Sequence, residues 1–160
     1  MRVAVRSATA ADRDWLASAY DADWEGPTMT LDGVDHPLLG QPTLVAVADT
    51  DPTGDPVGYL VHAARPHATE VLAMAAHPRG QGVGRILVEE LLERTTGTVT
   101  LVTTNDNLDA LGFYQRLGFR ITAVRVGAVD RSRAVKPAIP RIGDHGIALH
   151  DELVLELRRS

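Results

Sequence analysis

The chain has 160 residues, no cysteine and a formal net charge of −5. This length fits one domain, so we expect a single domain over residues 1–160. The lack of cysteine excludes a disulfide framework, a thiol nucleophile and a thiolate metal site, and the negative charge argues against a nucleic-acid partner. No apolar run reaches the roughly 18 residues of a membrane span, so we expect a soluble, cytoplasmic protein with no membrane partner.

Apolar periodicity predicts seven strands and three helices along the chain. The predicted strands are 2–6, 43–48, 57–64, 69–76, 98–104, 119–126 and 153–157. Three helices are predicted. The first ends at about Tyr20, the second covers 83–94, and the third runs from the polar residues 105–107 to Gly118. Segment 21–42 is predicted to be irregular because it is rich in Gly-Pro, Asp-Gly and His-Pro turns, and segment 127–150 contains no predicted element. This order is typical of an α/β (α+β) domain with a mixed sheet.

A glycine-rich turn joins the strand predicted at 69–76 to the helix predicted at 83–94. Its alternating glycines let the backbone turn sharply and approach a ligand closely, while the free N–H groups and dipole at a helix start attract phosphate. A tight turn without a ligand is the alternative, but two arginines flank the glycines and favour phosphate. The predicted phosphate site comprises Arg79, Gly80, Gln81, Gly82, Val83, Gly84 and Arg85.

The glycine-rich turn does not match two common phosphate-binding motifs, and this narrows the kind of phosphate ligand. A P-loop needs Gly-Lys-Ser/Thr, and the turn has no lysine, serine or threonine. The dinucleotide pattern G-x-G-x-x-G fails because its third glycine would fall on Arg85 or Leu87. Asn105-Asp106, after the next predicted strand, could imitate the acid that binds a ribose, so a Rossmann-like nucleotide binder stays an alternative.

Two motifs resemble those of one family. Arg79-x-x-Gly82-x-Gly84 is similar to the Gln/Arg-x-x-Gly-x-Gly/Ala loop of the GNAT (Gcn5-related N-acetyltransferase) family. The later stretch Asn107-x-x-Ala110-x-x-x-Tyr114-x-x-x-Gly118-Phe119 resembles the family's Asn-x-x-Ala-x-x-Phe/Leu-Tyr-x-x-x-Gly-Phe motif. The resemblance covers nearly the whole chain and points to a bacterial subgroup whose substrates are largely unassigned. It implies a mixed, mostly antiparallel central sheet of about seven strands flanked by helices.

The resemblance also implies a cofactor, acetyl-CoA, and roles for particular residues. Asn107 and Ala110 would contact the cofactor, and Tyr114 would contact it and protonate the leaving thiolate, for which a phenol is a suitable acid. Backbone N–H groups of Met74, Ala75 and Ala76 would polarise the thioester carbonyl. Packing of Tyr114 in the core is the alternative that its helical spacing also permits.

Direct transfer to an amine needs a base that removes a proton from the amine. Glu70, at the start of the strand 69–76, is the first candidate, because a partly buried carboxylate with a raised pKa would suit this task. A solvated acid at a strand end is an equal alternative for Glu70. His77 and Glu25 are weaker candidates for the base.

The predicted acceptor is a primary amine of a small molecule or an amino-acid-like compound. Trp24 and Glu25 could contact it from segment 21–42, although Trp24 could instead close the edge of the core. Arg133 and Lys136 could bind an acidic group of the acceptor, with a solvated surface or a homodimer contact as the alternative. The six histidines show no ligand spacing, so we expect no metal.

The sequence therefore favours an acetyl-CoA-dependent N-acetyltransferase. A non-catalytic acyl-CoA-binding or sensor module on the same fold is the second reading, and Tyr114 argues weakly against it.

Overall fold

The structure, a computed structural model, describes residues 2–159 and divides the chain into two compact units. Within this range, the first unit comprises the residues up to Met29 together with Pro37–Thr96. The second comprises Thr30–His36 together with the residues from Gly97 onwards. The single domain over residues 1–160 stays a prediction. No helix of the described range combines the length and apolar character needed to cross a membrane.

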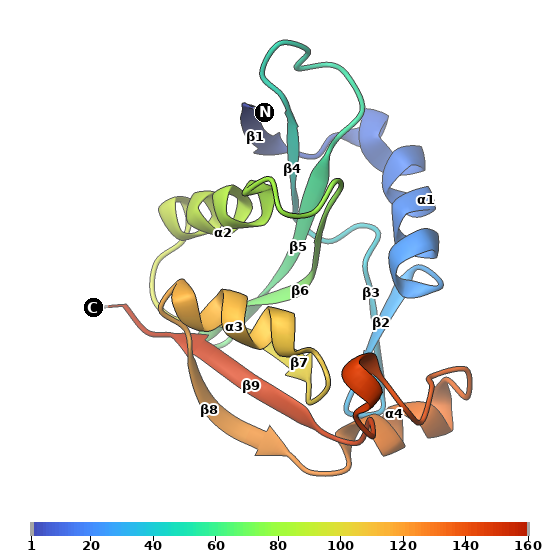
Figure 1. Cartoon of the computed structure of the whole chain (residues 1–160). Coiled ribbons are helices and arrows are strands. Elements are labelled where there is room, and N and C mark those ends of the chain that lie inside the picture. Colours follow the sequence, from blue (N-terminus) through green and yellow to red (C-terminus); the bar gives the residue numbers. More distant parts are fainter. Residues whose placement is uncertain (1, 160) are drawn as a thin grey trace. The chain divides into compact units, whose positions relative to one another are not determined.

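The first unit is a four-stranded antiparallel sheet with two α-helices and one short 3-10 helix (Figure 1). Its strands, in their order across the sheet, are β1 (Val3–Ser7), β4 (Thr43–Ala48), β5 (Gly58–Arg65) and β6 (Ala68–Ala76). Its helices are the short 3-10 helix η1 (Ala10–Asp12), α1 (Arg13–Trp24) and α2 (Val83–Arg94). Strand β4 and the first half of β5 are buried, as their continuous apolar sequence predicts.

The two long helices of this unit cover opposite faces of its sheet. Tyr59 of β5 stacks edge-on against Tyr20 of α1, with ring centroids 5.1 Å apart. The preceding residue, Gly58, faces α2, because a Cβ built there would lie 2.9 Å from Val83 Cγ1 and 3.3 Å from Leu87 Cδ1. Successive strand residues point to opposite faces, so α1 and α2 pack on different sides of β5, as Figure 1 shows. The missing side chain at position 58 lets α2 approach the sheet closely.

Helix α2 separates its apolar and charged residues as the sequence predicts. Its core face carries four buried residues, Val83, Leu87, Val88 and Leu91. Its exposed face carries two ion pairs at helical i, i+4 spacing, Arg85–Glu89 and Glu90–Arg94, each with a nitrogen–oxygen distance of 2.8 Å. The predicted helix 83–94 is confirmed.

The second unit is built on a three-stranded antiparallel sheet (Figure 1). Its strands, in order, are β7 (Val99–Thr104), β9 (Glu152–Leu157) and β8 (Arg120–Arg125), and its helices are α3 (Leu108–Arg116), α4 (Ala128–Val135) and the 3-10 helix η2 (Asp144–Gly146). The four strands of one unit and the three of the other confirm an α/β fold with about seven mostly antiparallel strands and flanking helices.

The prediction that segment 21–42 is irregular is wrong. Helix α1 continues to Trp24, and a hairpin follows, formed by β2 (Thr28–Leu31) and β3 (Val34–Pro37). The turn of this hairpin is held by side chains remote in sequence. The Asp32 N–H donates to Glu152 Oε2 at 2.9 Å, and the Gly33 N–H donates to Ser132 Oγ at 3.0 Å. Because these partners lie about a hundred positions along the chain, local sequence patterns could not show them.

The segment 127–150, in which no element was predicted, contains α4 and η2. Helix α4 begins after Gly127, whose φ of 74° lies in the left-handed region that favours glycine. Its sequence, AVDRSRAV, is short and has no clear apolar stripe, which is why periodicity missed it. Ala128, Val129 and Ser132 are its buried residues.

The packing at Gly58 predicts how two glycine substitutions differ in their effect on stability. Gly58→Ala should lower the free energy of unfolding by about 1–3 kcal/mol, because the new methyl group meets Val83 and the carbonyl oxygen of Ala75, which lies 3.0 Å away. Gly112→Ala, within α3, is the matched control. Its methyl group meets only the flexible end of Arg116, and a helical alanine should stabilise by about 0.5–1 kcal/mol. Urea unfolding measures both, and a Gly58→Ala protein as stable as the wild type would contradict this packing.

Candidate functional site

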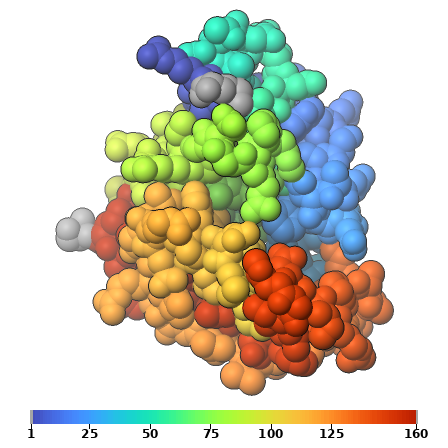
Figure 2. All heavy atoms as spheres, in the orientation of Figure 1, coloured from blue at the N-terminus to red at the C-terminus, as the bar shows by residue number. Residues whose placement is uncertain are grey.

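The glycine-rich turn leads directly from β6 into α2. Residues 77–82 are exposed, and the turn and α2 lie at the surface, in green in Figure 2. Gly80 and Gly82 have φ angles of 79° and 77°, in the left-handed region that costs other residues about 1–2 kcal/mol. Gly82 is also the N-cap of α2, so the turn needs glycine where the helix starts.

The start of α2 offers backbone donors in a favourable electrostatic setting. The first N–H groups of a helix have no partner within it, and here the first intrahelical bond runs from Ile86 N–H to the Gly82 carbonyl, at 3.2 Å. The first turn carries no acidic residue, so nothing there opposes an anion. A Cβ built at Gly80 or Gly82 meets no atom within 4 Å, so there is open space beside both. The predicted residues 79–85 therefore form one turn that could hold a phosphate group.

The residues before this turn, Met74 to Ala76, form the end of β6 and are half-buried. Their antiparallel partners on β5 are Leu60, Tyr59 and Gly58. The structure thus brings the predicted oxyanion donors and the predicted phosphate site together in the first unit, joined by His77 and Pro78.

Glu70 lies near the other end of the same strand. It is six residues before Ala76, roughly 20 Å along a β-strand. Its Oε1 accepts from Nε of Arg65 at 2.8 Å and lies 2.8 Å from Nη2 of the same guanidinium, as an ion pair.

The last turn of α1 carries a set of polar side chains that the sequence analysis only partly identified. Trp24 Nε1 donates to the Tyr59 hydroxyl, the Tyr59 hydroxyl donates to Asp23 Oδ2, and both distances are 2.7 Å. The Asp23 carboxylate also lies 3.0 Å from His77 Nε2. Glu25 is exposed at the end of α1, with a φ of 60°. Asp23 and Tyr59 were missed because their partners lie 35–54 positions away; the strongest local signal was a scarce tryptophan beside an aspartate.

The second predicted motif forms α3 and its cap in the second unit. The Asn107 side chain caps α3 by accepting from the Ala110 N–H at 3.1 Å. Tyr114 is buried and stacks edge-on with Phe113 and Phe119, at centroid distances of 5.0 and 5.6 Å. Burial raises the pKa of the Tyr114 phenol, so it stays protonated over the whole physiological range.

Arg133, expected to bind the acceptor, is engaged inside the second unit. Its side chain is only 10% exposed. The guanidinium donates to three backbone carbonyl oxygens, those of Ile139 at 3.0 Å, Pro140 at 2.8 Å and Leu149 at 2.9 Å. These contacts hold the segment after α4, and the acceptor role of Arg133 stays a prediction. Lys136 is half-buried at the C-cap of α4.

Comparison with known proteins decides the family. The model of the Acetyltransferase (GNAT) family matches residues 12–119, more than half of the chain, and both motifs fall inside the match. The chain belongs to the GNAT family. This confirms the resemblance expected from Arg79, Gly82 and Gly84 and from the Asn107–Phe119 stretch.

Individual relatives agree with this membership. The chain is 34% identical over 117 residues to the peptidyl-lysine N-acetyltransferase YjaB of Salmonella typhimurium, covering 73% of this chain and 72% of the relative. It is 29% identical over 147 residues to the uncharacterized protein YxbD of Bacillus subtilis, covering 89% of this chain and 91% of the relative. A GNAT family acetyltransferase from Elizabethkingia anophelis, solved with acetyl-CoA bound, aligns with a TM-score of 0.66 at 20% identity over 98% of both chains. This last similarity shows the shared fold.

Proposed function

We propose that this GNAT protein is an acetyl-CoA-dependent N-acetyltransferase that transfers an acetyl group directly to a primary amine. The acceptor is a small molecule or an amino-acid-like compound. The observation that carries the proposal is the turn at Gly80–Gly84, which presents free backbone donors at the start of α2 beside open space. Family membership supports acetyl transfer in general, and the acetyl-CoA bound to the Elizabethkingia protein of the same fold supports the cofactor.

The residues of the first unit fit the anionic and carbonyl parts of acetyl-CoA, which supplies an acyl thioester when bound. The N–H groups at Gly82, Val83 and Gly84 would bind the pyrophosphate, and the exposed Arg79 would add positive charge. Arg85 keeps an ion pair with Glu89, so its contribution is partly neutralised. Backbone N–H groups of residues 74–76 would stabilise negative charge on the carbonyl oxygen.

In the second unit, Tyr114 would act as the general acid. A phenol whose pKa is raised by burial holds its proton until a strong base appears beside it, and a departing thiolate is such a base. The Asn107 and Ala110 side chains lie on the same helix within two turns of Tyr114, so we keep them as cofactor contacts.

The acceptor is defined so far only as an amine. YjaB is named as a peptidyl-lysine N-acetyltransferase, and a lysine side chain ends in a primary amine, so a protein acceptor is the alternative to a metabolite. Trp24, Glu25, Arg133 and Lys136 remain the proposed acceptor contacts. A homodimer and a cytoplasmic location stay predictions of the sequence.

A non-catalytic acyl-CoA-binding or sensor module is the second candidate function. The packing of Tyr114 between Phe113 and Phe119 is the observation that favours it, because a core tyrosine would pack in the same way. A sensor would bind acetyl-CoA without releasing free thiol in the presence of any amine.

The loop assignment predicts the effect of blocking the turn. The Gly82→Val, Gly84→Val double variant should lose acetyl-CoA binding, because valine strains the left-handed backbone at Gly82 and the new side chains block the approach of the pyrophosphate. Gly97→Val introduces the same strain at a φ of 77° outside the turn, and it should keep wild-type affinity. Isothermal titration with acetyl-CoA measures all three proteins. A folded double variant with unchanged affinity would refute the loop as the phosphate site.

If Tyr114 is the general acid, removing its hydroxyl oxygen should slow the reaction. Tyr114→Phe should lower kcat by about 10²–10⁴-fold with little change in KM for acetyl-CoA, because the hydroxyl acts on charge that develops in the transition state. Tyr20→Phe, the same change at another buried tyrosine, should keep kcat within about threefold. Thiol release from acetyl-CoA with an amine acceptor gives both constants. Equal kcat for Tyr114→Phe and the wild type, with chemistry rate-limiting, would make Tyr114 a core residue.

A further inference from the structure

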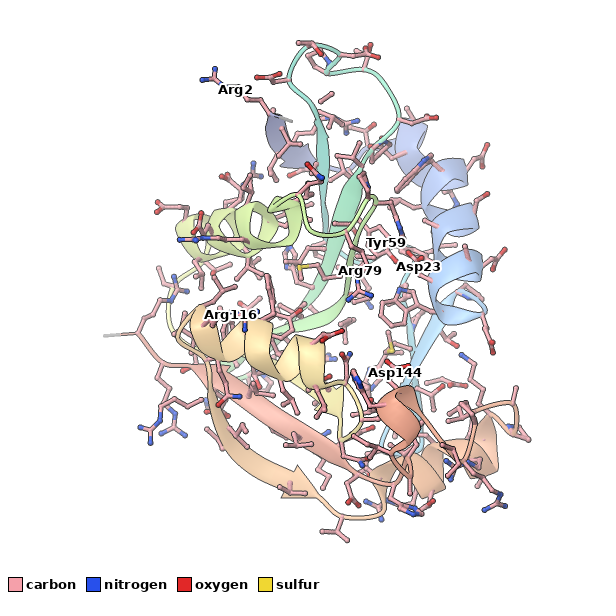
Figure 3. The ribbon with its side chains drawn as sticks, in the orientation of Figure 1. Arg2, Asp23, Tyr59, Arg79, Arg116 and Asp144 are labelled. Carbon is pink, nitrogen blue, oxygen red and sulfur yellow. The ribbon has the colours of Figure 1, made fainter. Side chains whose placement is uncertain are left out.

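Asp23 lies between two groups that come from different strand ends of the first unit. The Tyr59 hydroxyl of β5 donates to its Oδ2 at 2.7 Å, and His77 Nε2, just after β6, lies 3.0 Å from Oδ1 and 3.1 Å from Oδ2. Figure 3 shows Asp23 and Tyr59 pointing towards one another between α1 and β5. The Asp23 side chain is 14% exposed and that of His77 is 56% exposed. The pair is thus buried at the aspartate and open at the imidazole.

The direction of each hydrogen bond behind Asp23 is fixed by chemistry. An indole N–H can only donate, so the Tyr59 hydroxyl oxygen accepts from Trp24 and its hydrogen must point to Asp23. Burial and the neighbouring Asp23 carboxylate raise the pKa of Tyr59, so this phenol remains a donor. Asp23 therefore faces a permanent donor on one side and has acceptor capacity left for His77.

This arrangement sets the tautomer of His77. A carboxylate can only accept, so His77 donates through Nε2–H, and the lone pair of the neutral ring is left on Nδ1. Nδ1 has no hydrogen-bond partner among residues 2–159, and the ring is more than half exposed. A neutral imidazole with a free nitrogen, held by a carboxylate on the other nitrogen, is equipped to accept a proton.

We propose that His77 accepts the proton of the acceptor amine, directly or through one water, and that Asp23 and Tyr59 are its positioning residues. This inference rests on the proposed acetyl transfer. The amine nitrogen forms the new N–C bond and gives one proton to Nδ1 of His77, while the C–S bond breaks and the thiolate takes a proton from Tyr114. Solvent then removes the proton from His77 and restores the one on Tyr114, so one proton moves in net from nitrogen to sulfur.

Two further observations favour His77 over Glu70. His77 directly follows the predicted oxyanion donors at 74–76 and directly precedes the phosphate-binding turn, whereas Glu70 lies near the opposite end of β6. Glu70 already accepts a hydrogen bond from Arg65 and is ion-paired with it, whereas Nδ1 of His77 is open.

The test compares pH profiles of kcat/KM for thiol release from acetyl-CoA with an amine acceptor. His77→Gln keeps a donor towards Asp23 but cannot titrate, so the limb that rises with pH should disappear and the plateau should fall by about 10²-fold or more. Asp23→Asn and Tyr59→Phe should each lower kcat with KM nearly unchanged. His150→Asn is the matched control, because His150 makes a similar exposed pair with Asp130 at 3.2 Å and should keep the wild-type profile.

A readout without turnover tests the positioning role. Long-range ¹H–¹⁵N spectra of the free protein distinguish the two imidazole tautomers. When the His77 ring is neutral, they should show Nε2–H in the wild type but a mixture of the two tautomers in Asp23→Asn. An Nδ1–H tautomer in the wild type would overturn the proposal.

Other outcomes separate this proposal from the proposed function. An active wild type with an unaltered profile in His77→Gln overturns the role of His77 alone, and so does a rising limb lost in Glu70→Gln but kept in His77→Gln. A wild type that binds acetyl-CoA but releases no thiol with small amines or lysine peptides overturns the acetyl transfer and the proton acceptor together.

Discussion

The close packing of α2 against β5 is the constraint on which the proposed cofactor site depends. Gly58 has no side chain, so Val83 and Leu87 can sit directly on the sheet. Val83 is the first residue of α2 and is almost fully buried, which fixes the helix start rather than its middle or end. The turn from β6 must then reach that point within six residues, 77–82, and its left-handed glycines make this possible. Burial of the side chain at position 83 leaves its backbone N–H as the group available to a ligand.

Strand β5 serves both faces of the first unit through two adjacent residues. Gly58 admits α2 on one face, and Tyr59 organises the end of α1 on the other through its ring and its hydroxyl. The same residues pair with Ala76 and Ala75 of β6, the proposed oxyanion donors. A shift of one residue in the register of β5 would exchange these faces. Such a shift would remove both the close packing of α2 at Gly58 and the hydrogen bond from Tyr59 to Asp23.

The elements that could be predicted from the sequence are those marked by patterns among residues close together in the chain. The helix ending at about Arg94 and the strand 43–48 were predicted close to their observed bounds, because an amphipathic period and a buried apolar run are local signals. The hairpin of β2 and β3 was missed because its turn is held by Glu152 and Ser132, and α4 was missed because its eight residues lack an apolar stripe.

The candidate site divides along the same line. The turn at Gly80–Gly84 and the Asn107 cap could be predicted because each is formed by residues close together in the sequence. Charge alone suggested an acceptor role for Arg133, whose guanidinium holds three carbonyl oxygens. Asp23 carried only a weak local signal, the neighbouring tryptophan, since its partners are Tyr59 of β5 and His77, just after β6.

A crystal structure of the protein grown with acetyl-CoA tests the central claim most directly. The account predicts that the pyrophosphate oxygens accept hydrogen bonds from the backbone N–H groups at Gly82, Val83 and Gly84, at the usual 2.7–3.2 Å. Acetyl-CoA bound with its pyrophosphate away from the start of α2, or against side chains alone, would contradict it.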